Sequence, residues 1–482
     1  MTNRLKCLWG SNYRYALLGL AIAVIASVFL LIPRQSVEPR IFEDAAKVPN
    51  GPSIAVFQFR AADFRPSSGQ VDSTNAFATG LQFELLEKLW RFKNLRVIQG
   101  SLYADSQLLN VARDLQALYY LSGNIQLEDE KLTGTVVLAR TSDASIVWSR
   151  SFDETITNAA GLSQIESSIA ISVASALGQP YSRLNMDFTS EADRLSDMDL
   201  DHYLCLNQFY AYVDNKSEQE HRNIRDCLER ATNRWPNFSS GLAALSRIYG
   251  DEERNAFNRR PEDSPPMDRA LQAATSAIEA APDNPMAYQY HAIASFAVGN
   301  DDAFRRSAET ALRLNPNDPE ILADVGSHLI QLDLSETGQQ MVEKALALNP
   351  DAPSWYHGSI SMYHYMKGEP QKALEHALTF SENRSLLSQI LLTVSYVRAG
   401  NVSAARDTYK ATQITYPHFE TDYASIVESW RLPAGMAQFL FQDLEQAGFV
   451  INSQTLRRVW PFSISFFSVV PNSPDRRFLI LH

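Results

Sequence analysis

The sequence has few cysteines and no excess of positive charge, and both shortages exclude whole classes of protein. Three cysteines in 482 residues are too few for a disulfide-stapled small fold or a four-thiolate zinc site. Residues 1–40 carry five basic residues and one acidic residue, which leaves a net charge of −16 for the rest of the chain because the total is −12. A body this acidic lacks the clustered Lys and Arg that bind phosphates, so we expect no nucleic-acid partner.

Motifs that carry catalysis are also missing. The sequence contains no phosphate-binding glycine loop, no Gly-x-Ser-x-Gly turn around a nucleophile and no His-Glu-x-x-His zinc motif. We therefore expect a protein that is not an enzyme, with no catalytic residues, no cofactor and no metal site. An envelope enzyme without a recognisable motif is the competing hypothesis, and it requires a cluster of buried acids or a metal site in the structure.

The most informative segment near the start of the chain is the apolar run from Tyr15 to Ile32. It contains 18 residues and no charge, and a helix of that length spans about 27 Å, close to a membrane core of ~30 Å. Basic residues precede it, so the positive-inside rule predicts a cytoplasmic amino terminus. We expect a cytoplasmic tail (1–14), a transmembrane signal anchor (15–32) and a tether (33–52), with the bulk of a single-pass bacterial inner-membrane protein in the periplasm. A cleaved signal peptide is the alternative.

Residues 53–180 alternate between short β-prone runs and segments with helical spacing of apolar residues. This order predicts a mixed sheet with helices packed against it. The expected strands lie at 53–59, 95–98, 119–127, 132–139 and 146–152, and the expected helices at 77–92, 105–117 and 162–177.

Several of these segments resemble the TolB-like amino-terminal domain. The resemblance lies in Ser53–Phe59, Leu95–Ile98, Ala112-Arg-x-Leu115 before Tyr119-Tyr-Leu-x-Gly123, Leu132–Val137 and Ile146–Phe152. In similar proteins this domain commonly follows a membrane helix and precedes tetratricopeptide repeats, as in membrane-linked class III adenylate cyclases and CadC-type regulators. Only about 14 residues precede the apolar run here. We therefore expect that the cytoplasmic output domain is absent and that neither cyclase activity nor DNA binding carries over.

The second half of the chain has a repeat signature. Prolines recur at positions 282, 316 and 350, 34 residues apart, with Ala277, Ala311 and Ala345 five residues before them. This period is typical of tetratricopeptide repeats, in which small residues let two antiparallel helices approach closely. We expect an all-α tetratricopeptide-repeat solenoid over residues 198–449, ending in a closing helix, and an apolar C-terminal extension over residues 450–482.

Three histidines in the fifth repeat form a candidate soft-metal site together with nearby methionines. His357, His364 and His376 are the imidazoles, and Met362 and Met366 supply the sulfurs. No two of these histidines are four residues apart, the spacing that places two ligands on one helix face. We therefore interpret them as surface or groove histidines.

Two further sets of residues are candidates for structural or binding roles. Cys205 and Cys227 lie on the two helices expected for the first repeat and either form a disulfide in an oxidising periplasm or remain two buried thiols. The first helix of the fifth repeat is rich in aromatic side chains that either line a peptide-binding groove or pack between repeats. These residues are Trp355, Tyr356, His357, Tyr363, His364 and Tyr365.

The features together predict a binding protein more than a catalyst. We expect a membrane-anchored periplasmic protein-interaction or sensory protein that acts through a protein or peptide partner in the cell envelope. The alternative is a remnant or split receptor part of an adenylate cyclase or CadC-type transcriptional regulator, whose effector is absent or encoded separately.

Overall fold

The computed structural model describes residues 51–450, with short gaps within that range. These gaps are 62–67, 102–104, 129, 157–158, 181, 192–200, 215, 256, 334, 351, 422, 424–426, 428–429 and 433–434. The expected tail, anchor and most of the tether, and the C-terminal extension from residue 451, lie outside the described residues. Within the described residues, no helix combines the length and the apolar character needed to cross a membrane.

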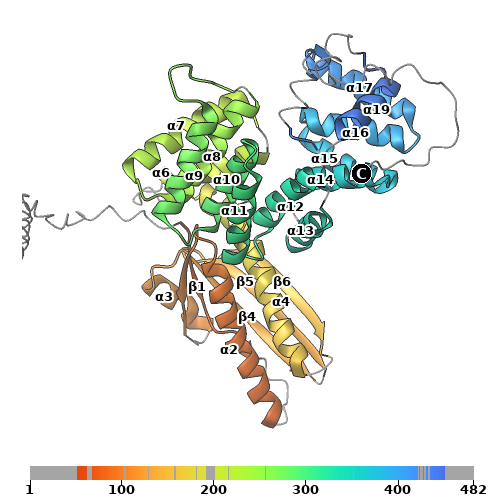
Figure 1. Cartoon of the computed structure of the whole chain (residues 1–482). Coiled ribbons are helices and arrows are strands. Elements are labelled where there is room, and N and C mark those ends of the chain that lie inside the picture. The colour runs from red at the N-terminus through yellow and green to blue at the C-terminus, as the bar shows by residue number, and fades with distance from the viewer. Residues whose placement is uncertain are drawn as a thin grey trace, which may run out of the picture. The chain divides into compact units, whose positions relative to one another are not determined.

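A mixed β-sheet forms the first part of the described chain (Figure 1). Its strand order is β3-β1-β4-β5-β6; β1 runs parallel to both of its neighbours, β4, β5 and β6 are antiparallel, and β2 pairs with β4. The predicted mixed sheet is therefore confirmed. The strands are β1 (Ser53–Val56), β2 (Arg60–Ala61), β3 (Arg96–Gln99), β4 (Tyr119–Glu128), β5 (Lys131–Arg140) and β6 (Ile146–Thr155).

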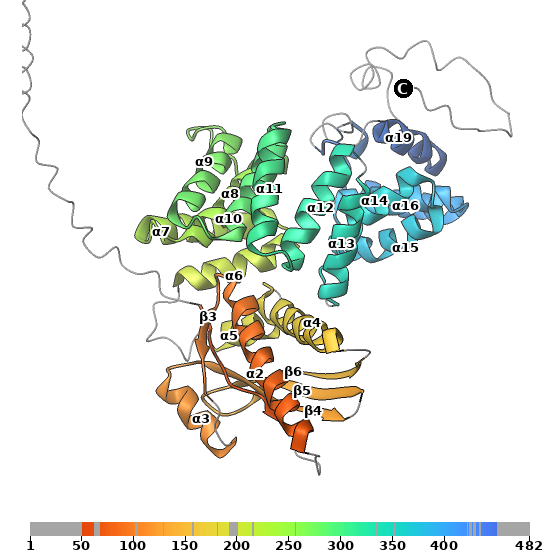
Figure 2. The same ribbon diagram turned by 60° about the horizontal axis from the view of Figure 1, so that its bottom comes forward.

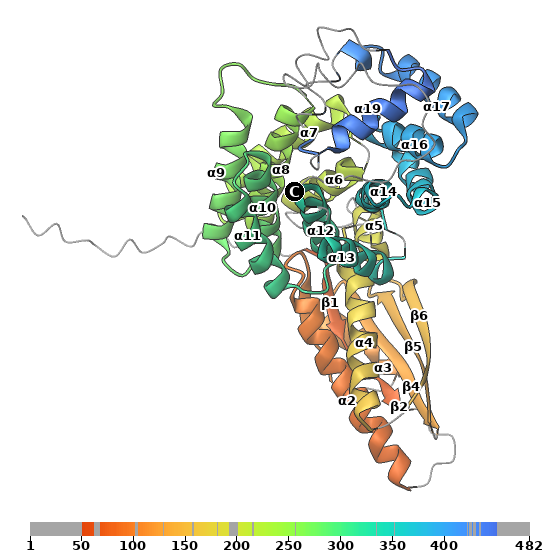
Figure 3. The ribbon, with the colours of Figure 1, turned by 45° about the vertical axis from the view of Figure 1, so that its right-hand side comes forward.

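Helices cover both faces of β1. Successive residues of a strand point to opposite sides of the sheet, so alternate residues of β1 are buried under different helices. Ile54 and Val56 belong to the large core under α2 (Ser68–Trp90) and α4 (Ala159–Gly178), which lie side by side (Figure 3). Ala55 and Phe57 pack in a second, smaller cluster with α3 (Asp105–Asp114). The buried run of β1 thus anchors two layers at once.

Two helical segments differ from the expectation. Helix α2 begins at Ser68, whereas the sequence predicted a start at Phe77. The prediction missed the first turns because they are polar and show no periodic spacing of apolar residues. Helix α5 (Arg183–Ser190) was not predicted. The hydroxyl of Ser182 caps α5 by accepting a hydrogen bond from the backbone N–H of Asn185 at 3.2 Å. The helix was missed because eight residues are too few to show a clear helical spacing of apolar residues.

The rest of the described chain consists of antiparallel helix pairs followed by a closing helix, as the 34-residue period predicts (Figure 2). Each first helix packs against its own second helix and against the next pair. The elements are α6 (Asp201–Asp214), α7 (Glu218–Arg234), α8 (Ser239–Arg254), α9 (Pro266–Ala280), α10 (Pro285–Ala297), α11 (Asp301–Leu314), α12 (Pro319–Asp333), α13 (Glu336–Leu348), α14 (Tyr356–Lys367), α15 (Pro370–Phe380), the short 3₁₀ helix η2 (Ser381–Asn383), α16 (Leu386–Arg398), α17 (Val402–Thr415) and α19 (Met436–Ala447).

Small residues set the spacing within the pairs. Ala277, Ala311 and Ala345 are fully buried on the second helices. In the α12/α13 pair, Gly326 and Gly338 face each other so closely that a Cβ atom on either would lie 2.6 Å from the backbone oxygen of the other. These two helices can therefore meet at this distance only where both residues lack a side chain.

A disulfide links the first helix pair. Cys205 of α6 and Cys227 of α7 are bonded, with their Cα atoms 5.7 Å apart and a sequence separation of 22. Cys205 is 2% exposed. The bond therefore ties together the two helices that begin the array, at a point that solvent barely reaches.

The close contact in the α12/α13 pair gives the first prediction. Gly326→Ala should lower the free energy of unfolding by about 1–3 kcal/mol, because the added methyl group must push the helices apart. Gly250→Ala in α8 is the matched control, since a Cβ there meets nothing within 4 Å, and it should raise stability by up to about 1 kcal/mol through helix propensity. Urea unfolding measures both, and equal effects of the two changes would contradict the argument.

The disulfide gives the second prediction. In a Cys7→Ser background, the unfolded and unreduced chain should present no thiol to a maleimide reagent. Reduction should then lower the free energy of unfolding by about 3 kcal/mol, on the chain-entropy account of a loop of this length. The Cys205→Ser/Cys227→Ser variant is the control, because its stability should not respond to reductant. Two thiols that label freely without reduction would rule out the bond.

Candidate functional site

The aromatic group of α14 lies mostly in the core between repeats. Tyr356 is fully buried and donates a hydrogen bond from its hydroxyl to Glu320 Oε2 at 2.6 Å, and Tyr365 is 3% exposed and donates to Asp443 Oδ2 at 2.6 Å. Tyr363 is 9% exposed. Trp355 is half-buried, and its indole N–H has no acceptor among the described residues. This burial favours the packing alternative, and a peptide groove at these residues stays a prediction.

The structure brings the three histidines together, contrary to what their spacing suggested. His357 and His364 lie two turns apart on α14, and His376 of the partner helix α15 meets both. The Nδ1 atoms of His357 and His376 are 2.8 Å apart, and the rings of His364 and His376 stack with centroids 5.8 Å apart. A seven-residue spacing shares a helix face as well as a four-residue spacing does, so the reasoning from i, i+4 alone was too narrow.

The surroundings of His357 and His376 favour neutral rings. Burial, and then the neighbouring His357 and His364, lower the pKa of His376 to about 4. Burial lowers the pKa of His357 as well, while Glu382 and Glu375 act in the opposite direction. His364 Nδ1 lies 2.6 Å from Glu369 Oε2. Within the described part of the chain, no group of three or more His, Cys, Asp or Glu side chains is placed to hold a metal ion.

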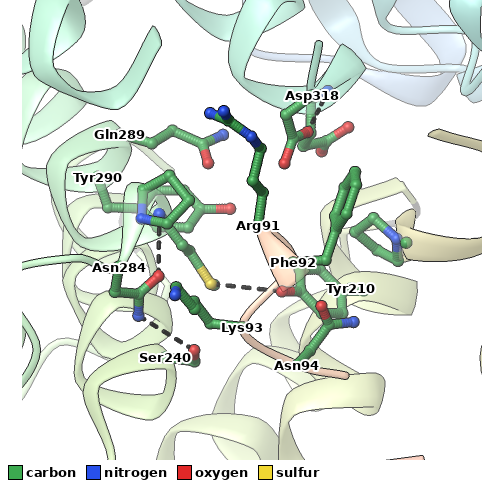
Figure 4. A pocket seen from close by; sticks show the side chains of 15 residues that line it. Arg91, Phe92, Lys93, Asn94, Tyr210, Ser240, Asn284, Gln289, Tyr290 and Asp318 are labelled. Atoms are coloured by element: carbon green, nitrogen blue, oxygen red, sulfur yellow. Dashed lines mark hydrogen bonds between the residues drawn. The ribbon is translucent and has the colours of Figure 1, made fainter. Parts of the chain in front are cut away.

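A small cavity marks the place where the sheet domain meets the helix array (Figure 4). Arg91 Nη1 donates to the carbonyl of Leu314 at 2.8 Å, Lys93 pairs with Asp283 at 2.8 Å, and Ser175 Oγ donates to the carbonyl of Asn317 at 3.0 Å. The cavity between these contacts measures about 40 Å³. That volume holds a few water molecules at most, so this region is a packed joint rather than a ligand site.

A larger cavity of about 200 Å³ lies among α8, α9 and α10. We call it the arginine pocket, because three of the residues that line it are arginines. Apolar side chains of α9 and α10 complete the wall. Its main lining residues are Arg247, Gly250, Arg254, Tyr290, Phe296 and Arg431.

The three arginines differ in how they are partnered. Arg431 donates to the carbonyl of Phe296, pairs with Asp301 Oδ1 at 3.0 Å and lies over the Phe296 ring. Arg247 has a single long contact, 3.8 Å from Nε to Asp251 Oδ2, and its Nε is buried without a hydrogen-bond acceptor among the described residues. Arg254 forms no hydrogen bond or ion pair with any residue that the structure describes. Two guanidinium groups on one face of α8 thus lack a close carboxylate partner among the described residues.

The carboxylates near the arginine pocket balance part of its charge: burial by itself would lower the pKa of Arg247, but Asp251 and Asp324 raise it. Burial by itself would raise the pKa of Asp251, but Lys216, Arg247 and Arg254 lower it, and this carboxylate is held by Lys216 Nζ at 3.0 Å and by the hydroxyl of Tyr212 at 3.1 Å. Burial raises the pKa of Asp324. Burial, together with Asp324, raises the pKa of Glu320 to about 8, so this carboxyl group carries a proton at neutral pH.

A buried histidine reports the resulting positive potential. His328 of α12 is 5% exposed. Burial first, and then the charges of Arg254, Arg247 and Arg431, lower the pKa of His328 to about 3. The three arginines therefore act on one region. The sequence does contain a signal for the arginine pocket. Arg247 and Arg254 are seven residues apart on one first helix, with Gly250 between them on the same face, whereas the sequence prediction of a binding site considered aromatic residues.

The histidine cluster gives the third prediction. Because the pKa of His376 is lower in the folded state, the unfolded chain takes up a proton on this residue at a higher pH than the folded chain does. The free energy of unfolding is therefore highest above pH 6.5 and decreases as the pH falls towards 4. His376→Gln should reduce the loss of unfolding free energy between pH 7 and pH 4.5 by about 1–3 kcal/mol. Urea titrations at the two pH values measure this. His418→Gln, at an exposed histidine, should leave the loss unchanged, and identical behaviour of the two variants would refute the argument.

Comparisons with known proteins add little beyond this geometry. No protein-family model matches the chain, and no curated protein matches it. A PelC dodecamer from Paraburkholderia phytofirmans is 20% identical over 27% of this chain and 91% of its own, with a TM-score of 0.20. A tetratricopeptide repeat protein from Parabacteroides merdae is 16% identical over 54% of this chain and 97% of its own (TM-score 0.31), and a human IFIT1 dimer with PPP-AAAA is 13% identical over 52% and 60% (TM-score 0.38). Scores this low carry no argument about function.

Proposed function

We propose that this chain is a membrane-anchored binding protein of the bacterial cell envelope, which holds a protein or peptide partner through its helix-pair array and acts without catalysis of its own. The observation that carries the proposal is the arginine pocket. It is a cavity of about 200 Å³ among the helices of the array, with hydrogen-bonding groups that no described residue uses. Unused donors on a concave wall are what a partner needs in order to be held in one orientation.

Two features support the proposed location. The apolar run from Tyr15 to Ile32 has the length and composition of a membrane anchor. The disulfide between Cys205 and Cys227 fits an exported body, because disulfides persist in oxidising compartments such as the periplasm. Both features agree with a short cytoplasmic tail and a periplasmic bulk.

The sheet domain supports a sensory role as the finer proposal. It is joined to the array at Arg91, Lys93 and Ser175 through contacts to residues 283, 314 and 317. Tyr290 lines both the joint and the arginine pocket. A partner in the pocket thus lies one side chain away from the sheet domain. The same arrangement suits the alternative, a receptor part whose cyclase-type or winged-helix effector is a separate chain.

The fourth prediction tests the binding role directly. The full chain should stay with membranes after carbonate washing, and chemical crosslinking in those membranes should capture a specific partner. Gly250→Leu should reduce that capture at least 10-fold, because Gly250 lines the pocket and a Cβ atom there has nothing within 4 Å, so the new side chain fills space that the partner needs. Phe83→Leu, at an exposed residue of α2, is the control and should capture normally.

Two outcomes would count against the proposal. A shortened form released in the wash would show that the apolar run is a cleaved signal rather than an anchor. Equal capture by Gly250→Leu and by the original chain would show that the arginine pocket does not hold the partner. A captured protein with a cyclase or winged-helix domain would favour the receptor alternative.

A further inference from the structure

We propose that the arginine pocket binds an acidic side chain of the partner peptide, with Arg247 and Arg254 holding its carboxylate and the apolar wall of α9 and α10 holding a neighbouring apolar side chain. The inference rests on the proposed function, because it takes the partner to be a peptide. It adds the chemistry by which the peptide is recognised.

The two arginines carry the argument, because they lack the partners that half-buried guanidinium groups normally have. The Arg247 side chain is only 14% exposed, yet its nearest carboxylate oxygen is 3.8 Å away. Arg254 has no hydrogen bond or ion pair within the described part of the chain, and burial together with the charge of Arg247 lowers its pKa. Arg247 and Arg254 repel each other, and the nearby carboxylates offset this only in part, because Asp251 Oδ2 lies 3.8 Å from Arg247 Nε. An anion in the pocket would reduce the remaining repulsion.

A second observation, independent of the arginines' charges, lies at the same place. Ser246 also lines the pocket, is 2% exposed, and its hydroxyl finds no hydrogen-bond partner among the described residues. Buried polar groups are paired in the great majority of cases. Ser246 Oγ and Arg247 Nε are therefore two buried polar atoms, on consecutive residues that line one cavity, and no described residue supplies their hydrogen bonds.

The surroundings favour a carboxylate over a phosphate. Asp251 and Glu253 line the same pocket, and Asp251 stays ionised because Lys216, Arg247 and Arg254 lower its pKa. A second negative charge on the ligand would gain attraction from the arginines but would also meet repulsion from these carboxylates, so the site does not require a doubly charged group. A planar carboxylate also matches the fork of a guanidinium, which donates two parallel hydrogen bonds to it.

The remaining wall accounts for the apolar side chain. Met267, Ile293 and Phe296 also line the pocket. A cavity of about 200 Å³ exceeds the ~150 Å³ that holds a benzene ring in an engineered protein core. One aliphatic or aromatic side chain therefore fits beside the carboxylate. We expect a peptide in which Asp or Glu stands next to a residue such as Leu.

The fifth prediction uses two fluorescein-labelled pools of random hexapeptides and the full disulfide-bonded chain. One pool has Asp-Leu fixed at its centre, and the other has Asn-Leu. Fluorescence anisotropy should show the Asp-Leu pool binding at least 10-fold more tightly. Arg254→Gln and Arg247→Gln should each weaken that binding roughly 10- to 100-fold, as the loss of a charge-assisted hydrogen bond does.

Matched controls separate a site from a general effect of charge. Arg306→Gln removes one positive charge from an exposed position on α11 and should leave binding unchanged. Arg254→Gln should melt at the same temperature as the original chain or higher, because it removes a repulsive contact. If Arg254→Gln fails to fold, Arg254→Lys replaces it, and this variant should weaken binding less because it keeps the charge.

Several results would overturn the inference. Equal binding of the two pools would rule out the carboxylate, and stronger displacement by inorganic phosphate than by acetate would change its chemical class. Tighter binding of a synthetic peptide of residues 471–482 than of the Asp-Leu pool would make the chain's own end the occupant. If Arg254→Gln still captures the partner from membranes as the original chain does, the proposed function stands and this inference falls.

Discussion

The short distance between the two helices of each pair determines how the rest of the array packs. Gly326 and Gly338 allow the backbones of α12 and α13 to come into direct contact. The buried alanines at 277, 311 and 345 likewise allow a close approach of the helices in three successive pairs. Because each pair is narrow, the first helices of neighbouring pairs also come into contact. A glycine on a first helix either lets a neighbouring helix approach, as Gly326 does, or leaves open space, as Gly250 of α8 does.

The placement of charge follows from this packing. A narrow array has little interior volume, so side chains such as Glu320, Asp324 and Asp251 are buried even though they are polar. Their neighbours then decide which of them stay ionised: Lys216 keeps Asp251 negative, while burial favours the protonated form of Glu320. The result is an acidic protein in which the interior around the arginine pocket is locally rich in basic residues, a pattern that net charge alone conceals.

The sequence predicted the architecture well and the site poorly, for physical reasons. Repeats are easy to recognise because the same packing problem recurs every 34 residues with the same solution, alanine followed by proline. The sheet was predictable because β4, β5 and β6 are consecutive and joined by short turns. The arginine pocket depends on which side chains lack partners, and that is a property of several helices at once. The histidine cluster was missed for a related reason, since His376 reaches His357 only across the helix pair.

Arg431 departs most clearly from contacts between neighbouring repeats. It adopts a φ of +46°, which is uncommon for a residue with a side chain, and it bonds to Phe296 and Asp301, 135 and 130 positions earlier in the chain. Helical repeats ordinarily touch only their neighbours, so they can unfold one unit at a time. A contact that skips several repeats closes a long loop of chain, which costs conformational entropy. The contact can form, and can offset that cost, only when the segments at both of its ends are folded. The middle of the array and its C-terminal end should therefore lose their structure as one cooperative unit, and amide exchange in α10 and around Arg431 should follow the same opening event.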